Sequence, residues 1–321
     1  MLHKNKPAYV WGVFCSFSSA FIWGTSHISG RWLMSNRCID VLSLCCIRYT
    51  CGGLFLLAAG MFFQRRKILS VKFRDLLLLN WLAFLGIVAH SALLLLGQAY
   101  TTATNSSLIL ALNPVMAMFI GLFLGYRINF FKAFGTGLSL LGCLMVVGVI
   151  SRHGFDYSSN HLFGDAITLV SAFFWALYMV FSAKTAARLG GFTITVWTML
   201  AGAVQFLLLR IFLPIETHIP AWEAGTQWLV IFYVVFFPTA VGFYFWYEAM
   251  SKIELSLLNI MQYLTPIATI ILSYFILHEK MTALNVIGAM LIFSGVMIAS
   301  GLIRLPLKRK NCLFAGNASR V

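Results

Sequence analysis

Long apolar stretches separated by short polar gaps run along the whole chain. A helix needs about 20 apolar residues to cross the hydrocarbon core of a membrane. The stretches predict ten transmembrane helices, near residues 9–30, 41–63, 75–98, 104–125, 132–150, 162–183, 193–213, 226–247, 255–277 and 283–303. Because the gaps are short, no soluble domain is inserted, and we expect an all-α integral membrane protein.

The composition supports this class, since 60% of the 321 residues are hydrophobic and only 10% are charged. Soluble domains carry about 25% charged residues and cannot hide this much apolar surface. The net charge of +14 does not indicate nucleic acid as a partner, because most Lys and Arg residues lie in the gaps between the apolar stretches. There they act as topology determinants that face the cytoplasm and its anionic lipids.

The same basic residues predict the orientation of the chain. If the N-terminus is inside, most of the 23 Lys and Arg residues fall in inside segments, and Arg65-Arg66-Lys67 after the second span is the strongest single indication. We therefore expect both termini in the cytoplasm, with residues 304–321 as a cytoplasmic tail. The expected location is the bacterial inner (plasma) membrane, where the protein contacts lipid; a homodimer is left open.

The two halves of the chain repeat one another. The sequence Ser19-Ala20-Phe21-Ile22-Trp23 in the first span matches Ser171-Ala172-Phe173-Phe174-Trp175 in the sixth. Four further pairs stand at compatible offsets: Gly12 with Gly164, Pro114 with Pro266, Gly135 with Gly288, and Gly142 with Gly295. Coincidence could explain one such match, but several matches in the same order indicate a duplication.

The duplication predicts an inverted arrangement. Each copy holds five spans, which is an odd number, so the second copy must sit upside down relative to the first. We expect one five-helix repeat at residues 9–150 and a second at residues 162–303. Inverted repeats with a binding site between them are a common construction among secondary transporters.

These motifs together resemble the EamA-type branch of the drug/metabolite transporter superfamily. The resemblance extends from about Gly12 to Gly301. It rests on the Trp motifs of spans one and six, Arg48-Tyr49, the Ala99-Tyr100 and Ala249-Met250 turns, Asn113-Pro114 and Thr265-Pro266, and the Gly-x6-Gly spacing of spans five and ten. It implies ten helices in two inverted repeats, and export, or sometimes uptake, of small metabolites such as amino acids.

The first half departs from the pattern of this family at one position. An acidic residue usually closes the proline-bearing helix in both halves, and the second half has Glu279 there. The first half has Tyr126-Arg127 instead, so the contact that this acid makes in relatives is in doubt for the first repeat.

Polar and aromatic side chains inside the spans are the candidates for a substrate cavity, because polar groups in membrane helices avoid lipid. We expect the cavity between the repeats, lined by spans one, three, four, six, eight and nine, with spans five and ten as scaffold. The candidate residues are Trp23, Thr25, His90, Asn113, Trp175, Tyr178, Tyr244, Gln262 and Tyr263. Packed aromatic rings and hydrogen-bonded histidines, His27 included, are the simpler alternatives for several of them.

Other residues have candidate roles beside the cavity. Pro114 and Pro266 each remove a backbone hydrogen bond and predict a kink, which serves packing, gating or both. Arg48 lies within the second span, where a structural anchor is favoured over a role in binding or gating. Glu248 and its counterpart Gln98 are candidates for proton coupling, although a solvated acid near the inner surface is the simpler interpretation of Glu248.

No catalytic or metal-binding pattern occurs in the sequence. It has no H-E-x-x-H, P-loop or G-x-S-x-G motif, no cluster of acids at metal spacing, and none of its seven cysteines forms C-x-x-C. We therefore expect neither an enzyme nor a cofactor, and nothing in the chain that would couple transport to ATP.

The pattern as a whole predicts a secondary transporter that works by alternating access on a small amphipathic solute. Export of an amino acid or a related compound is the leading expectation. The alternative is uptake or exchange of a nucleotide-like metabolite such as S-adenosylmethionine, for which Glu248 is the one acid within a span. A lipid-modifying membrane enzyme and a non-transporting sensor are the other classes, and the duplicated halves favour neither.

Overall fold

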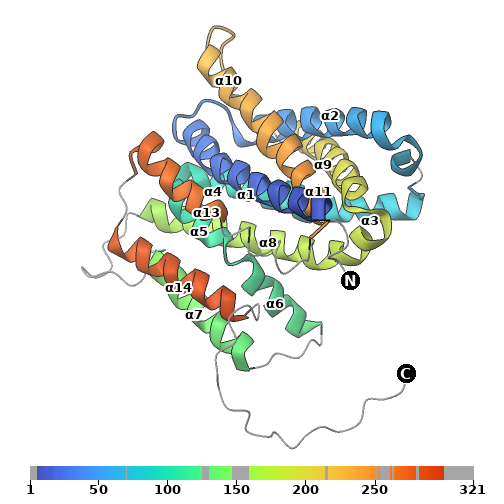
Figure 1. Ribbon diagram of the computed structural model, residues 1–321. Helices are drawn as coiled ribbons and strands as arrows, with labels where there is room; N and C mark the ends of the chain where they lie inside the picture. Colours follow the sequence, from blue (N-terminus) through green and yellow to red (C-terminus); the bar gives the residue numbers. More distant parts are fainter. Residues whose placement is uncertain are drawn as a thin grey trace, which may run out of the picture.

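The computed structural model describes residues 6–69, 71–124, 130–146, 159–213, 216–250, 252–253, 261, 264–279 and 282–299. Regular secondary structure within these ranges is helical, as Figure 1 shows. The predicted all-α class is therefore confirmed.

The helices of the first half follow the predicted order. They are α1 (Lys6–Ser35), α2 (Val41–Leu69), α3 (Phe73–Ala83), the π-helical segment η2 (Phe84–Ala89), α4 (His90–Tyr100), α5 (Ala103–Leu110), α6 (Asn113–Phe123) and α7 (Phe130–Val146). The segments α3, η2 and α4 form one uninterrupted stretch, whereas α5 and α6 are separated by a turn just before Pro114.

The second half begins with α8 (Ser159–Leu189) and α9 (Gly191–Phe212). It continues with α10 (Gly225–Val234), the π-helical segment η3 (Val235–Val241), α11 (Gly242–Met250), α13 (Leu264–Leu272), the π-helical segment η4 (Ser273–Leu277) and α14 (Ala283–Ala299).

Within the part of the chain that the structure describes, five helical stretches are long and apolar enough to cross a membrane: Val41–Phe63, Phe73–Tyr100, His161–Ser182, Gly191–Phe212 and Gly225–Ala249. Large apolar side chains on these stretches point outward; Phe62 and Leu229, for example, are exposed. Such a surface suits contact with lipid tails and would be unusual in water. The chain is therefore a multi-pass membrane protein.

The start of α2 is fixed by a side-chain cap from Asp40. Its carboxylate accepts hydrogen bonds from the backbone N–H of Ser43 (2.8 Å) and from the backbone N–H of His218 (3.0 Å). Burial alone would raise the pKa of Asp40, but these hydrogen bonds favour the charged form and lower it below its ordinary value. The cap thus ties the α1–α2 turn to the segment before α10.

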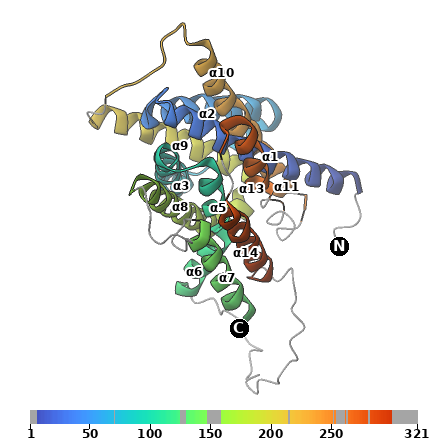
Figure 2. The ribbon, with the colours of Figure 1, turned by 90° about the vertical axis from the view of Figure 1, so that its left-hand side faces the viewer.

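The helices α7 and α14 lie side by side at one end of the molecule, in both Figure 1 and Figure 2. A Cβ atom added at Gly142 would lie 2.6 Å from the carbonyl oxygen of Gly288, and one added at Gly295 would lie 2.4 Å from the carbonyl oxygen of Gly135. Gly135 corresponds to Gly288 and Gly142 to Gly295, so the contact is reciprocal and antiparallel. Small residues at such positions let helix backbones touch in a membrane.

Around the middle of the protein, helices from the two halves alternate. α1 packs against α4, α11 and α13, and α8 packs against α4, α5 and α6. α2 crosses α9 on the side away from α7 and α14. The long stretches α3–η2–α4 and α10–η3–α11 each contain a π-helical segment near the middle, a feature that often occurs at functional sites.

Candidate functional site

A cavity of about 110 Å³ lies at the centre of this arrangement. Side chains from α1, α2, η2, α4, α6, α8, α11 and α13 line it. They are Trp23, Ser26, His27, Arg48, Tyr49, Gly86, His90, Ser91, Leu94, Asn113, Trp175, Phe243 and Thr265. The set combines aromatic rings, hydroxyls, an amide and basic groups, and none of these described lining residues is acidic.

The cavity gathers equivalent positions from the two halves. Trp23 and Trp175 both line it, and so do Asn113 and Thr265, the residues that precede Pro114 and Pro266. Phe243 lies between the two tryptophans, with ring centroids 5.2 Å from Trp23 and 6.3 Å from Trp175. Four predicted residues therefore meet here: Trp23, His90, Asn113 and Trp175.

The π-helical segment η3 positions two of the lining groups. Pro238 has no N–H, so the carbonyl of Val234 loses its usual partner. The hydroxyl of Thr239 donates to that carbonyl instead (2.9 Å) and accepts a hydrogen bond from Nε of Arg48 (2.5 Å). In addition, Nε1 of Trp23 donates to the carbonyl of Pro238 (3.0 Å). The irregular backbone of η3 thus holds Arg48 and Trp23 in place.

The two histidines are held by hydrogen bonds to neighbouring helices. Nδ1 of His27 lies 3.2 Å from the amide nitrogen of Gln98 and 3.1 Å from the hydroxyl of Ser106. Nδ1 of His90 lies 3.1 Å from the carbonyl oxygen of Ser171, which can only accept, so this Nδ1 carries a proton. The His90 ring also packs on Trp175, with centroids 4.8 Å apart.

Of the remaining predicted cavity residues, those that the structure describes lie outside the central cavity. Thr25 donates to the carbonyl of Ile22 and contacts the hydroxyl of Tyr233. Tyr178 is buried with its ring against Gly86, where a Cβ atom would lie 2.4 Å from the ring. Gln262 and Tyr263 lie outside the described residues.

Pro114 is the second residue of α6, where a missing N–H leaves no hydrogen bond unmade, so this proline marks the start of the helix. Pro266 lies in α13, and residues 262–263 just before this helix are outside the described ranges. Whether these points bend during transport stays a prediction.

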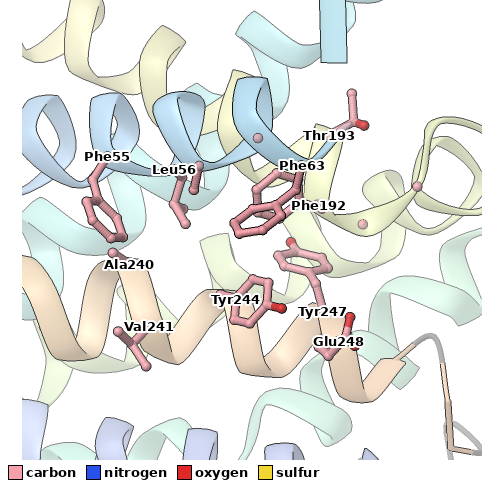
Figure 3. A pocket seen from close by; sticks show the side chains of 14 residues that line it. Phe55, Leu56, Phe63, Phe192, Thr193, Ala240, Val241, Tyr244, Tyr247 and Glu248 are labelled. Atoms are coloured by element: carbon pink, nitrogen blue, oxygen red, sulfur yellow. The ribbon is translucent and has the colours of Figure 1, made fainter. Parts of the chain in front are cut away.

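The coupling candidates differ in environment. Gln98 is buried and bonded to His27, whereas Glu248 forms an ion pair with Lys252 and accepts from Nε1 of Trp11 (3.3 Å). Glu248 and Tyr244 line a different pocket of about 460 Å³ between α2, α9 and α11, shown in Figure 3. That pocket is larger but mostly apolar, and its Phe63 is 79% exposed, which is typical of a groove that faces lipid. The central cavity is the better candidate site.

Sequence reasoning missed the contribution of α2 to the cavity wall. Arg48 and Tyr49 both line the cavity, although the second span was not expected to contribute. A buried arginine in an apolar span was a usable signal, because such a charge needs protein or water around it. The hydroxyl partners, such as Ser91 beside Tyr49, have no such signal, since serine is common in packed membrane helices.

The profile of the EamA-like transporter family matches residues 10–148 and again residues 162–301. Similar proteins include the uncharacterized transporter YyaM of Bacillus subtilis, 29% identical over 70% of this chain and 73% of the relative, and an uncharacterized transporter of Archaeoglobus fulgidus, 28% identical over 77% and 85%.

A probable terminal-alkyne amino-acid exporter of Streptantibioticus cattleyicolor is 26% identical over 75% of this chain and 77% of that protein. A solved crystal structure superposes with a TM-score of 0.64 at 19% identity, covering 93% of this chain and 98% of the other. The profile and the names of these relatives indicate transporters rather than enzymes.

Proposed function

Because this chain belongs to the EamA-like transporter family, we propose that it is a secondary transporter that moves a small amphipathic metabolite by alternating access. The observation that carries the proposal is the central cavity, which takes equivalent residues from both halves of the chain. Trp23 faces Trp175 across Phe243, and Asn113 and Thr265 form a second matched pair. A site between two related halves can open to either side as the halves rock against each other.

The proposal includes ten spans in two inverted repeats, residues 9–150 and 162–303. The reciprocal contact of α7 with α14 supports it, because a two-fold axis between the helices exchanges Gly142–Gly288 with Gly295–Gly135. The matching positions of η2 and η3 and the double match to the family profile support it further. With both termini in the cytoplasm, the α4–α5 turn and Glu279 face the outside.

Under the proposed orientation, two sets of contacts at helix ends would close the outer side of the cavity. The Arg31 guanidinium donates to the carbonyls of Gln98 (2.8 Å) and Ala99 (2.9 Å) at the end of α4. The Glu279 carboxylate accepts from the backbone N–H of Ala103 (2.9 Å) and Thr104 (3.2 Å) at the start of α5. The positive charge of Arg31 lies at a helix C-terminus and the negative charge of Glu279 at a helix N-terminus, so the helix dipoles stabilise both contacts. Both side chains would have to move away from these helix ends before a solute could leave to the outside.

Export of amino acids or related compounds is the direction and class that we propose, as for the probable amino-acid exporter of Streptantibioticus cattleyicolor. Exchange of a nucleotide-like metabolite such as S-adenosylmethionine is the second candidate. The volume of the central cavity, about 110 Å³, argues against this candidate, because pockets for drug-sized ligands measure roughly 300–1,000 Å³.

The proposal is tested by thermal unfolding of the purified protein with amino acids, S-adenosylmethionine, nucleotides and amines at pH 6 and pH 8. A ligand at about 100 times its Kd stabilises the folded state by about 2.7 kcal/mol. The expected hit is an amino acid whose effect disappears in Trp23→Ala and Trp175→Ala. A hit that is indifferent to both substitutions would move the site away from the central cavity.

A further inference from the structure

The unusual group in the central cavity is Arg48. Its side chain is only 8% exposed, and its one hydrogen bond to the described residues runs from Nε to the hydroxyl of Thr239. A guanidinium has five N–H donors, so both terminal nitrogens, Nη1 and Nη2, have no hydrogen-bond acceptor in the described part of the chain. The Tyr49 ring, with its centroid 5.4 Å from Cζ, covers one face of the guanidinium without accepting these donors.

Arg48 also has no carboxylate partner within the described residues. The ion pairs found there are Arg188–Asp75 and Lys252–Glu248, and neither involves the cavity. A buried cation without a counter-charge is strongly unfavourable, and in a membrane it is tolerated when a function uses it. The two terminal nitrogens form the planar fork that carboxylates fit in a bidentate manner.

A second polar group of the cavity lacks a partner. Oδ1 of Asn113 is buried and accepts no hydrogen bond from the described residues. Asn113 lines the same cavity as Arg48, and rotation of its amide about χ2 would present this oxygen to a ligand. An ammonium group is the donor that such an acceptor would take, and the faces of Trp23 and Trp175 nearby favour a cation as well.

We infer that Arg48 binds the carboxylate of the transported solute and Asn113 accepts from its ammonium group, so that the cavity selects small zwitterionic amino acids. Trp23, Trp175 and Phe243 surround the apolar part of the solute. Net cations such as S-adenosylmethionine are disfavoured, because Arg48 adds a positive charge and no described lining residue supplies a negative one. This inference rests on the proposed transport function and deepens it.

The test uses matched probes on the full-length protein in detergent and in proteoliposomes. L-alanine, L-serine, L-leucine and L-phenylalanine are each compared with their methyl esters and with the corresponding decarboxylated amines, which keep the ammonium group and lose the carboxylate. Binding is measured by thermal stabilisation, and transport by exchange of the labelled compounds. The variants are Arg48→Met, Arg48→Lys and Asn113→Ala, with Arg210→Gln as the control arginine outside the cavity.

We expect the wild-type protein to bind at least one of these amino acids at least about 30-fold more tightly than its ester or amine, because a buried charge pair is then left incomplete. Arg48→Met removes this preference, Arg48→Lys keeps part of it, and Arg210→Gln leaves it unchanged. Asn113→Ala weakens binding of the amino acid. It leaves unaltered the binding of a compound without the amino group, such as 4-methylpentanoate.

Four results would overturn the inference. The first is that the esters or amines bind to the wild-type protein as tightly as the amino acids. This result needs no variant, so it holds even if Arg48→Met fails to fold. A folded Arg48→Met protein with unchanged discrimination would overturn the inference as well. Exchange of amines without the amino acids would leave the transporter standing and remove the carboxylate site, whereas a wild-type protein that neither binds nor exchanges any probe would remove both.

Discussion

Replacing Gly142 or Gly295 with alanine tests the contact between α7 and α14. The added methyl group would lie 2.6 Å from the Gly288 carbonyl oxygen in the first case and 2.4 Å from the Gly135 carbonyl oxygen in the second. Both obstacles are backbone atoms, so no side chain can turn aside to make room. Each substitution must therefore push the two helices apart.

The size of the effect follows from these distances. An ordinary contact begins near 3.4 Å, so α7 and α14 must separate by about 0.8 Å at Gly142 and about 1.0 Å at Gly295. Overpacking of this kind costs about 1–3 kcal/mol. The two variants should be affected to a similar extent, because the two-fold relation between the helices makes the sites equivalent.

The assay is thermal unfolding of each variant, followed by intrinsic fluorescence at a fixed heating rate, with Gly137→Ala as the matched control. Gly137 lies on the same helix and has no atom within 4 Å of its added Cβ, so alanine there should be neutral or slightly stabilising. We expect Tm to fall by roughly 2–10 °C in Gly142→Ala and Gly295→Ala. The close contact between α7 and α14 would be refuted if both variants kept the wild-type Tm, or if their Tm changed no more than that of Gly137→Ala.

Three further substitutions probe single interactions. Thr239→Val, which keeps the shape of the side chain and removes the hydroxyl that joins Arg48 to the Val234 carbonyl, should destabilise the protein by about 1–3 kcal/mol in thermal unfolding; a neutral result would mean that η3 does not need this hydroxyl. Glu279→Ala should cost about 0.5–2 kcal/mol by the same measurement, since the N–H groups of Ala103 and Thr104 lose their acceptor, and unchanged stability would argue that water replaces the carboxylate. The lowered pKa of Asp40 stabilises the fold above the unfolded-state pKa, so this contribution should fade as pH falls below about 4. Asp40→Asn should therefore be less stable at pH 7 and lose less stability on acidification, and parallel pH curves for the two proteins would contradict the cap.

Much of the fold could be predicted from the sequence because the solvent imposes it. Apolar stretches of about 20 residues must be helical in lipid, so the order of the helices followed from the hydrophobic pattern. Trp23 and Trp175, which the sequence matches between the two halves, both line the central cavity. The π-helical segments were not predicted, because they depend on tertiary contacts such as that of Trp23 with the carbonyl of Pro238.

The environment of single polar residues was less accessible. The sequence favours a structural role for Arg48, whereas the structure places it in the cavity wall with two terminal nitrogens that no described residue accepts from. Tyr178 resembled a cavity residue, yet its ring packs on Gly86, and only the three-dimensional fit of ring and glycine could reveal this. A single sequence gives the face of a membrane helix poorly, because both lipid and neighbouring helices accept apolar side chains.

The most direct test of the central claim is amino-acid exchange in proteoliposomes. The protein is reconstituted with an unlabelled neutral amino acid inside, and entry of the labelled compound is followed for the wild-type protein, Trp23→Ala and Trp175→Ala. Phe134→Ala, an exposed position on α7, serves as the control. The account predicts saturable exchange that both tryptophan variants lose and Phe134→Ala keeps. Exchange that survives in folded Trp23→Ala and Trp175→Ala would contradict transport through the central cavity.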